Sequence, residues 1–466
     1  MPLNRRDFLN RSMFAAAGVM LAGSVEVLAT APGAVADSIG FGPLVDDPKG
    51  VLALPRGFSY RILTRAGETR LVSGQPTPNK HDGTAAFAGD NGATLLVNNH
   101  EIKDPLATAS HPVPHLDGLV YDPAAAGGCT VVEISSGGAV REWVGIAGTS
   151  TNCAGGSTSW GTWLTCEETE AKAGSNGMTK DHGYVFEVDP RNAAANQNPQ
   201  PIKALGRFAH EAVVIDEGHG PVYLTEDASS PNGLLYRWTP PKDFKHGPGQ
   251  FKTLAADAGV FEAFKCFDSN GQFVDDLSRA TKLGTMYKLQ WVNVPDRDAR
   301  TTSVRKQFAA GEVTRARKLE GMWWGDGGVY FVSSYAGSES PVQHDGQVWY
   351  LDPSNQTITL KLLLAVNPDP AVDGPFDGPD NITVSPYGGL VLATDGDGLQ
   401  HLFGATLEGQ TYPIARNQVN TGTADAPSYS EFAGVTFSPD KSTLFANIQS
   451  PGILLAITGP WDGDDD

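Results

Sequence analysis

The chain has 466 residues, of which 54 are Gly and 32 are Pro, and its formal net charge at pH 7 is −19. This length allows several ordinary domains or one large repeat fold, and the many Gly and Pro residues favour an all-β protein with many turns. The negative charge argues against nucleic acid and anionic lipid as partners, and it suits a protein that binds cations.

The first 36 residues have the pattern of an export signal. Arg5 and Arg6 precede a moderately apolar stretch at residues 13–28, and a small-x-small end follows at residues 34–36. The pattern predicts a twin-arginine signal peptide over residues 1–36, the twin-arginine translocase as a partner, and a periplasmic or extracellular location. An ordinary signal peptide with a chance Arg pair is the alternative. No later stretch is apolar and long enough to span a bilayer, so we expect no membrane anchor.

From residue 82 onward, a pair of strands recurs six times. The first member starts with a polar or acidic residue, and the second is strongly β-forming and ends on a polar or acidic residue. The pairs are residues 82–87 and 95–101, 153–156 and 162–168, 210–216 and 222–227, 320–324 and 329–334, 377–384 and 390–395, and 431–437 and 444–448. A third strand that stops near a Pro turn is expected at residues 119–123, 184–189, 235–240 and 348–353.

This recurrence predicts an all-β fold, a β-propeller with six blades, in one domain over residues 37–466. The interval between the third and fourth pairs is unusually long. We interpret residues 240–315, with a helix-like stretch at residues 277–289, as a partly helical insertion between blades, although this interval can instead hide a seventh blade. The strand at residues 58–63 is expected to complete the last blade and to remove an exposed edge.

The ends of these strands carry the candidate metal ligands. In a propeller the innermost strands line a central channel, so residues at their equivalent ends converge. The converging residues are Asp82, Cys153, Glu211, Glu320, Asp377 and Glu431 on the first strands, and Glu101, Glu167, Glu168, Glu226 and Asp227 on the second strands. So many carboxylates repel one another unless cations lie among them, although exposed strand ends are also commonly acidic.

Cys153 bears on the kind of cation. Carboxylates alone suit hard cations such as Ca²⁺, whereas one added thiolate suits a transition metal such as iron. Cys153 is therefore predicted to bind iron, with a disulfide to Cys166 or an inert buried thiol as the alternatives. His81, His100 and His210 each precede a motif acid and can either orient that acid or bind metal.

Several segments resemble the PhoX-type alkaline phosphatases, a family of bacterial enzymes exported by the twin-arginine route. The most specific is the run NCAGGSTSWGTWLTCEE at residues 152–168, and the others are residues 81–87, 98–101, 319–321, 376–381 and 431–435. The resemblance implies a propeller with central iron and calcium ions that hydrolyses phosphate monoesters at alkaline pH. The ligands that it implies are Cys153, Glu168, Glu211, Glu226, Glu320, Asp377 and Glu431, and we count Asp380, in one of these segments, with them.

Two positions depart from the pattern that the resemblance implies. Where an Arg is expected two residues before Glu320, to hold phosphate, the chain has Lys318 with Arg317 beside it. The fifth second strand ends on Thr394 and Asp395 where a Glu-Asp pair is expected. Lys318, Arg317 and Arg416 are therefore the candidate catalytic residues that bind phosphate.

The predicted function is an exported alkaline phosphatase that hydrolyses small-molecule phosphate monoesters as a monomer, with Ca²⁺ and Fe³⁺ as cofactors. The ions would supply both the nucleophile and the charge stabilisation, and no Ser-centred nucleophile motif is evident. One alternative is a calcium-dependent lactonase- or phosphotriesterase-like hydrolase, against which Cys153 argues. The other is a non-catalytic metal-binding propeller.

Overall fold

A computed structural model describes residues 39–462, and the predicted signal peptide at residues 1–36 lies outside this part. The described chain is built of strands and loops, with helices that are short 3₁₀ turns. The turns are η2 (Asp90–Gly92), η3 (Ala193–Asn196), η4 (Lys203–Leu205), η5 (Gln250–Thr253), η6 (Leu277–Arg279) and η7 (Val304–Gln307). Within residues 39–462, no helix has the length and apolar character needed to cross a membrane.

The described strands form five antiparallel sheets. One sheet consists of β4 (His81–Ala88), β5 (Thr94–His100), β6 (Gly127–Ile134) and β7 (Val140–Thr149). A second consists of β8 (Asn152–Ser157), β9 (Trp163–Glu167) and β10 (Val185–Val188). A third consists of β25 (Phe432–Phe437), β26 (Thr443–Ile448), β27 (Ile453–Thr458) and β3 (Ser59–Arg65). A fourth consists of β21 (Pro379–Val384), β22 (Leu390–Thr394), β23 (His401–Ala405), β24 (Thr411–Asn417), β2 (Leu52–Pro55) and β1 (Leu44–Val45).

The fifth sheet has ten strands and contains both the third and the fourth repeats. The third repeat supplies β11 (His210–Ile215), β12 (Val222–Glu226), β13 (Leu235–Thr239) and β14 (Val260–Phe267), with β15 (Phe273–Val274) paired to β14. The fourth repeat supplies β17 (Leu319–Gly325), β18 (Gly328–Ser333), β19 (Gly346–Asp352) and β20 (Thr357–Leu364). The strand β16 (Met286–Asn293) pairs with both β14 and β20 and so joins the two repeats.

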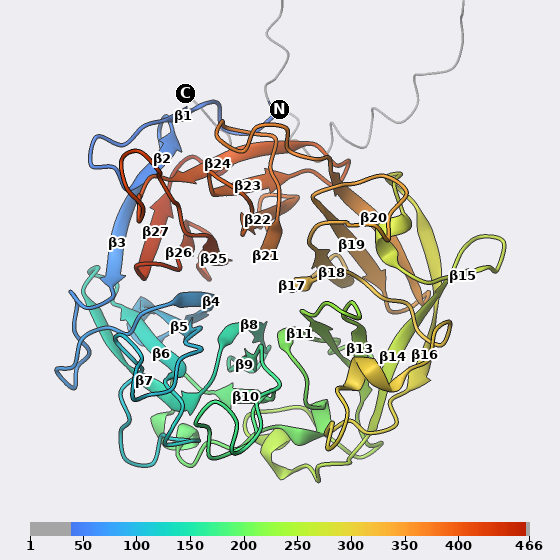
Figure 1. The fold of residues 1–466 in the computed structure, drawn as a ribbon. Coiled ribbons are helices and arrows are strands. Elements are labelled where there is room, and N and C mark those ends of the chain that lie inside the picture. The colour runs from blue at the N-terminus through green and yellow to red at the C-terminus, as the bar shows by residue number, and fades with distance from the viewer. Residues whose placement is uncertain (1–38, 463–466) are drawn as a thin grey trace, which may run out of the picture. The chain divides into compact units, whose positions relative to one another are not determined.

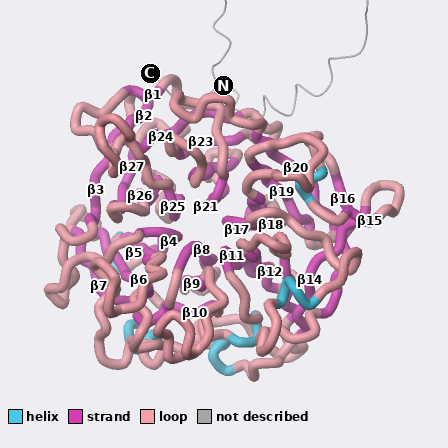
Figure 2. Tube along the Cα trace, viewed as in Figure 1, coloured by secondary structure: helices cyan, strands magenta, loops and turns pink. Residues whose placement is uncertain are grey.

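Six strands lie innermost and follow one another around a common centre (Figures 1 and 2). β4 contacts β8, and the series continues through β11, β17, β21 and β25, which contacts β4 again. This closed series confirms the prediction of an all-β, propeller-like arrangement. Six separate blades are not seen, because β16 fuses two of the repeats into one sheet.

The helix predicted over residues 277–289 is wrong. η6 covers only Leu277–Arg279, and the following residues belong to β16, in which buried Tyr287 and Leu289 alternate with exposed residues. A period of two is the pattern of a strand, and it outweighs the helix-like composition of this segment. Residues 261–264 belong to β14, which pairs with β13 as the fourth strand of the third repeat. The segment at residues 240–315 therefore carries strands and short 3₁₀ turns.

Three of the four predicted third strands are confirmed, as β10, β13 and β19. The prediction at residues 119–123 is wrong, because β6 is the third strand of that sheet. Asp122 instead forms a turn, in which its Oδ1 accepts a hydrogen bond from the Ala124 N–H at 2.9 Å. Asp side chains favour such turns because they can bond to the backbone two residues further on.

Strands from the beginning of the described chain complete sheets near its end. β3 pairs with β27 along its whole length, as the sequence predicted for residues 58–63. β2 pairs with β24, and β1 pairs with β2. These pairings cover two sheet edges that would otherwise expose unpaired backbone groups.

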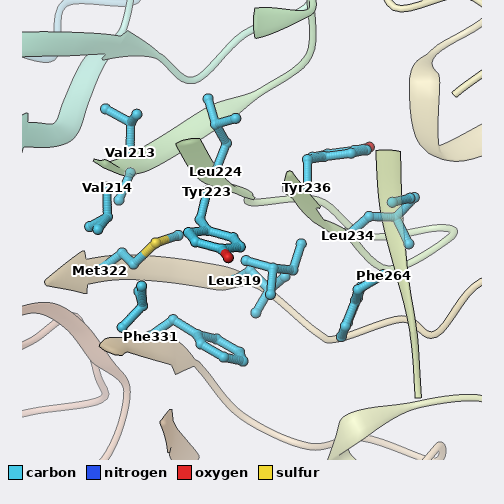
Figure 3. Packing of buried hydrophobic residues seen from close by; sticks show 14 of the residues in the cluster. Val213, Val214, Tyr223, Leu224, Leu234, Tyr236, Phe264, Leu319, Met322 and Phe331 are labelled. Atoms are coloured by element: carbon cyan, nitrogen blue, oxygen red, sulfur yellow. The ribbon is translucent and has the colours of Figure 1, made fainter. Parts of the chain in front are cut away.

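The largest hydrophobic cluster packs where the third and fourth repeats meet (Figure 3). Val213 of β11 and Leu224 of β12 lie in it with Leu319 and Met322 of β17 and Phe331 of β18, and all are buried. Truncation of such a buried Leu to Ala costs about 2–5 kcal/mol. This packing fixes the positions of β11 and β17, whose first residues carry candidate ligands.

Candidate metal centre

A β-bulge interrupts each of the six inner strands near its start. The pairing register shifts between His81 and Thr84, Asn152 and Gly155, His210 and Val213, Leu319 and Met322, Pro379 and Ile382, and Ala433 and Thr436. A bulge adds a residue to one strand and re-aims its side chain. Asp82, Cys153, Glu211, Glu320 and Asp380 lie inside these bulges. The repeat therefore places a ligand-type side chain at the same irregular position of one strand after another.

Neighbouring repeats hold the backbone of these bulges in place. Asn99 Nδ2 of β5 donates a hydrogen bond to the carbonyl oxygen of Cys153 at 2.7 Å. Thr225 Oγ1 of β12 donates to the carbonyl oxygen of Glu320 at 2.8 Å. The strands also approach closely, since a Cβ on Gly83 would lie 2.5 Å from the carbonyl oxygen of Cys153. These contacts fix where each ligand side chain begins.

The structure brings side chains together in three groups that can each hold a metal ion. The groups are Cys153, Glu168 and Glu211; Glu211, Glu320 and Asp380; and Asp380, Asp395 and Glu431. Within each group the ligand atoms lie within 4.8 Å of one another. This spacing fits a cation with ligands at about 2.3–2.6 Å. Because Glu211 and Asp380 each belong to two groups, the three groups form one continuous series.

The chemistry of these groups fits a bound cation. Burial, followed by the charges of Asp380 and Glu320, raises the pKa of Glu211 well above its usual value. Burial, followed by Asp395, raises the pKa of Asp380 to about 7. Burial, followed by Glu211, likewise raises the pKa of the Cys153 thiol. A cation would favour the ionised form of every one of these groups.

Three further predicted residues border this series. Asp227 raises the pKa of both Glu168 and Glu320, second only to the effect of burial. Glu101 does the same for Asp82, again after burial. Asp82, Glu101 and Asp227 are therefore three more acids that lie around the three groups.

Glu167 and Glu226 lie outside the three groups. Each directly precedes a residue at the centre, and successive side chains of a strand point to opposite faces. Glu167 Oε1 accepts a hydrogen bond from His182 Nδ1 at 2.6 Å. Glu226 accepts one from the Tyr236 hydroxyl at 2.6 Å and forms an ion pair with Arg305 at 3.1 Å.

Asp377 is also outside the groups. Burial and the neighbouring Asp345 raise the pKa of Asp377 to about 6. The strand β21 begins at Pro379, so the bulge falls at Asp380, three residues further on. Asp380 therefore occupies in this repeat the place that Glu320 occupies in the one before.

Of the predicted phosphate-binding residues, only Lys318 lies beside the centre. Its Nζ is 3.1 Å from Glu320 Oε1 and 3.9 Å from Asp227 Oδ2. Arg317 instead pairs with Glu339 at 3.0 Å. Arg416, on β24, pairs with Asp373 and Asp46. The structure does not bring Arg317 or Arg416 to the three groups.

Sequence reasoning missed two residues beside the centre. Asp395 belongs to the third group and directly follows β22, a position equivalent to that of Asp227 after β12. Lys103 Nζ lies 2.9 Å from Glu101 Oε1. Asp395 could have been found from its place at the end of a second strand, whereas Lys103 follows the end of β5 in a loop and carried no repeat signal.

The structure bears on the alternatives predicted for the cysteines and the motif histidines. Cys153 and Cys166 are both free, so the disulfide alternative is not seen. His210 Nε2 bonds to the Gly206 carbonyl at 3.1 Å. Burial lowers the pKa of His100 to about 4 and that of His210 to about 3, so both are neutral at pH 7. Within residues 39–462, His81, His100 and His210 belong to none of the three groups.

The fold and the centre define a propeller-like protein whose inner strands present carboxylates and one thiol for metal binding. The family described as Alkaline phosphatase PhoX matches residues 39–143 and 135–452. The chain therefore belongs to the PhoX alkaline phosphatase family, and it is a phosphatase.

A solved structure shows the same fold. The chain is similar to Pseudomonas fluorescens PhoX in complex with vanadate, a transition state analogue, with a TM-score of 0.63 and 18% identity over 88% of this chain and 96% of that chain. It is also similar to a virginiamycin B lyase from Staphylococcus aureus with quinupristin, with a TM-score of 0.39 and 12% identity over 86% of this chain and 99% of that chain. No curated protein matches the chain significantly.

Proposed function

We propose that this protein is an exported phosphatase that hydrolyses small-molecule phosphate monoesters at alkaline pH with calcium and iron at its centre. The observation that carries the proposal is the continuous series of three ligand groups, each built from the bulged or flanking ends of strands around the centre. Membership of the PhoX alkaline phosphatase family supports the reaction class. We count the ten-stranded sheet as two fused blades, which gives six.

The donor sets support two kinds of ion. The group of Cys153, Glu168 and Glu211 offers one sulfur and two carboxylates, which suits Fe³⁺. The other two groups offer carboxylates alone, which suit Ca²⁺. When bound, such ions activate a nucleophile and neutralise charge on the phosphoryl group.

The chain's own residues would hold the phosphoryl group beside these ions. The charge of Glu320 raises the pKa of Lys318, so the ammonium remains protonated at alkaline pH. Lys103 is held near the centre by its ion pair with Glu101, and the charges of Glu101 and Glu168 outweigh the effect of burial and raise its pKa. The ammonium groups of Lys318 and Lys103, both beside the centre, can donate hydrogen bonds to the anionic oxygens of a monoester.

The alkaline pH dependence has a basis in the same residues. A phosphate monoester loses its second proton with a pKa of about 6, so it is a dianion above pH 8. In the metal-free protein, burial and then Asp395 raise the pKa of Asp380 to about 7, so this shared ligand becomes ionised, and able to take up a cation, as the pH rises through that range. Both changes favour the complex between the ionised centre with its cations and the dianionic monoester as the pH rises.

Elemental analysis and a standard assay test the proposal together. Protein exported through its own pathway should contain iron and calcium and should hydrolyse p-nitrophenyl phosphate with an optimum above about pH 8. Lys318→Met should lower kcat/KM by about tenfold or more, whereas the exposed residue Lys282 offers a matched control. Folded, metal-loaded protein with no turnover of monoesters would contradict the proposal. Turnover of lactones or phosphotriesters alone would point to the alternative hydrolase, and no turnover at all to a metal-binding propeller.

Export is part of the same proposal. Arg5 and Arg6 and the apolar stretch after them support a twin-arginine signal at residues 1–36 and the translocase as a partner. We propose that the exported protein is a monomer in the periplasm or medium. Replacing Arg5 and Arg6 with Lys should leave the protein in the cytoplasm, which fractionation measures. Unchanged export of this variant would contradict the twin-arginine assignment.

A further inference from the structure

A pocket of about 400 Å³ adjoins the metal centre. It shares Glu101 and Glu431 with the acids of the centre. Its remaining lining residues are Asn79, Lys80, Ile102, Lys103, Asp104, Ser110 and Gln449. A pocket of this size holds more than a phosphoryl group, and its place beside the centre suits the alcohol part of an ester.

Lys80 is the cation of this pocket that has no carboxylate partner. Lys103 pairs with Glu101, and Lys318, at the centre, pairs with Glu320. The Nζ of Lys80 instead donates a hydrogen bond to the amide oxygen Oε1 of Gln449 at 2.9 Å, and within residues 39–462 it forms no ion pair. An ammonium has three donors, so two remain for a ligand.

The backbone holds Lys80 firmly at the rim of the pocket. Its φ is +54°, in the left-handed region that side chains other than Gly seldom adopt. Its N–H donates to Asn79 Oδ1 at 2.7 Å, and its carbonyl oxygen accepts from the Glu101 N–H at 2.8 Å. Such an unfavourable conformation persists only where the surroundings determine it.

Lys80 occupies the same place in the first repeat as Lys318 does in the fourth. Each residue stands two positions before the acid inside the bulge, and Lys318 also has a positive φ, of +42°. The repeat thus places both lysines near the centre through the same left-handed backbone conformation. Lys318 faces the acids of the centre, whereas Lys80 faces the pocket.

A neutral amide connects Lys80 to the centre. The Nε2 of Gln449 donates to Glu101 Oε2 at 2.5 Å, while its Oε1 accepts from Lys80. Gln449 is buried, so its orientation is fixed by these two bonds. The charge of Lys80 therefore stays available, one side chain away from an acid of the centre.

We propose that Lys80 binds a second anionic group on the alcohol part of the substrate. The protein would accordingly prefer phosphate monoesters whose alcohol carries a carboxylate or another phosphate over esters of neutral alcohols. This inference rests on the proposed phosphatase function and names the substrate class that the site selects.

A matched pair of substrates tests the inference on the wild-type protein. 3-Phosphoglycerate carries a carboxylate where glycerol 1-phosphate carries a hydroxymethyl group. Metal-loaded wild type should show a kcat/KM for 3-phosphoglycerate at least about tenfold higher, since a charge-assisted hydrogen bond is made only by the carboxylate. The ratio of kcat/KM for propane-1,3-diol bisphosphate to that for 3-hydroxypropyl phosphate tests in the same way whether a second phosphate is preferred. Ratios near one for both pairs would overturn the inference.

Variants assign the preference to Lys80. Lys80→Met keeps the apolar stem and should bring the ratio of the two kcat/KM values close to one, and Lys80→Gln provides a second replacement if the first fails to fold. Lys103→Met should lower both kcat/KM values by a similar factor, because Lys103 lies next to the acids of the centre. Lys282→Met, at an exposed turn before β16, is the control. An unchanged ratio in folded Lys80→Met and Lys80→Gln would overturn the inference.

Binding without turnover gives an independent measurement. Isothermal titration calorimetry should show that 3-phosphonopropionate binds metal-loaded wild type at least about fivefold more tightly than propylphosphonate, and that Lys80→Met removes this difference. Equal affinities for wild type would contradict the inference while leaving the phosphatase proposal intact. If no monoester is hydrolysed at all, both proposals fail.

Discussion

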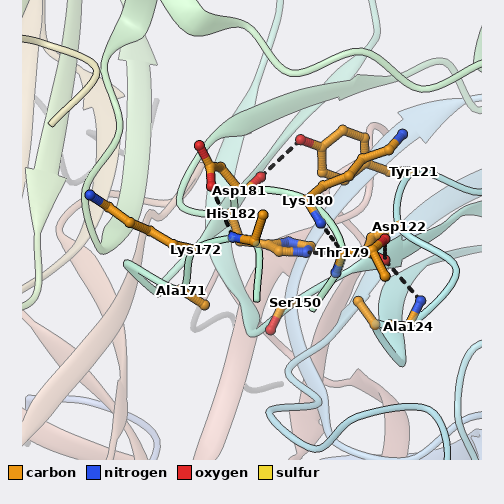
Figure 4. Close-up of polar contacts among 12 residues, drawn as sticks. Tyr121, Asp122, Ala124, Ser150, Ala171, Lys172, Thr179, Lys180, Asp181 and His182 are labelled. Carbon is orange, nitrogen blue, oxygen red and sulfur yellow. Dashed lines mark hydrogen bonds and ion pairs between the residues drawn. The ribbon is translucent and has the colours of Figure 1, made fainter. Parts of the chain in front are cut away.

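Two buried sets of acids in this protein are built on opposite principles. Around Asp122, His182 and Glu167, every oxygen of the two carboxylates has a donor from the chain itself. Figure 4 shows the part of this network around Asp122 and His182. Asp122 Oδ2 accepts from the N–H groups of Thr179 and Lys180, each at 2.8 Å. His182 lies between the two acids, 2.6 Å from Glu167 and 3.2 Å from Asp122. This network is complete without any ligand.

The ligand carboxylates of the metal centre have fewer such donors, although Asp380 Oδ1 accepts a hydrogen bond from Asn381 Nδ2 at 2.9 Å. Glu320 Oε1 is buried without a hydrogen bond, although Lys318 Nζ lies 3.1 Å away as an ion pair. Within the described residues, no donor bonds to the side chain of Glu211. Buried polar groups without partners are costly in a folded protein. The difference teaches that the network stabilises the fold by itself, whereas the centre is arranged for cations that come from outside.

The largest expected effect is on catalysis at the centre. Glu211→Gln removes a carboxylate that two ligand groups share, so kcat/KM for p-nitrophenyl phosphate should fall by about a thousandfold or more. Elemental analysis should show loss of metal from the same protein. Glu217→Gln, an exposed acid beyond the other end of β11, is the matched control and should keep full activity. Activity within tenfold of wild type in Glu211→Gln would remove Glu211 from the centre.

The same substitution in the network should act on stability. Glu167 Oε2 accepts bonds from the N–H groups of Gly183 at 2.8 Å and Tyr184 at 3.1 Å, and Oε1 accepts from His182. Glu167→Gln leaves a buried, charged imidazolium with a weaker partner, so the free energy of unfolding should fall by about 3–5 kcal/mol. Urea denaturation measures this change. A midpoint equal to that of wild type would show that the network contributes little.

The network should also make stability depend on pH. Burial alone lowers the pKa of His182, but the charge of Glu167, and then hydrogen bonds to Glu167 and Asp122, raise it to about 9, above the usual 6.5. A pKa that is higher in the folded state gives stability that is fully present below pH 6.5 and is lost as the pH rises through 9. We expect a loss of about 3 kcal/mol between pH 6 and pH 10. Denaturation curves of His182→Asn should lack this part of the dependence.

After removal of metal, Glu211→Gln should raise the stability of the protein. In the metal-free protein, the Glu211 carboxylate is repelled by Asp380 and Glu320. Its neutral replacement should therefore stabilise the chelated protein, by about 1–2 kcal/mol, although it abolishes activity in the loaded one. Melting curves of both proteins after chelation measure this difference. A lower melting temperature for metal-free Glu211→Gln would show that the acid is internally satisfied, as Glu167 is.

The smallest effect is expected at the cation beside the centre. Lys318→Arg keeps the positive charge and can donate to two phosphoryl oxygens at once. Its kcat/KM should remain within about threefold of wild type, because the main contribution is charge. Steady-state kinetics on p-nitrophenyl phosphate give the answer. A loss of more than tenfold would mean that the compact ammonium beside Glu320 and Asp227 is itself required.

The comparison also explains what the sequence could predict. The inner strands and their bulge residues repeat along the chain, so the repeat alone places Cys153, Glu211 and Glu320 at a common centre, and Glu431 directly precedes the sixth inner strand. Glu167 and Glu226 could not be told apart from the ligands, since adjacent acids at a strand end look alike until the alternation of the strand is known. The ten-stranded sheet was missed because β16 pairs with strands of two repeats, and such long-range pairing leaves little trace in local sequence.

Sequence reasoning also missed residues that lie in loops. Lys103 and Lys80 meet the centre only through tertiary contacts, with Glu101 and Gln449. Lys103 stands in a loop outside the repeated strand pairs, whereas Lys80 stands two residues before Asp82, as Lys318 does before Glu320, so its place in the repeat was a signal that went unused. Both Asp377 and Asp380 were predicted as ligands, but Asp377 was placed at the converging strand end, because the start of β21 cannot be predicted to within three residues around the Gly-Pro segment.

The pairing of β3 with β27 joins two segments that leave the ribosome at very different times. Ser59 of β3 precedes Thr458 of β27 by 399 residues, so β3 emerges long before the strand with which it pairs. The sheet of β25, β26, β27 and β3 is therefore complete only once β27 has been synthesised. The ligand groups extend from Cys153 to Glu431, so they are complete only once Glu431 has been synthesised. Metal loading of the whole centre must therefore follow synthesis of the intervening residues, and a chain that stops before β27 leaves β3 without its partner strand.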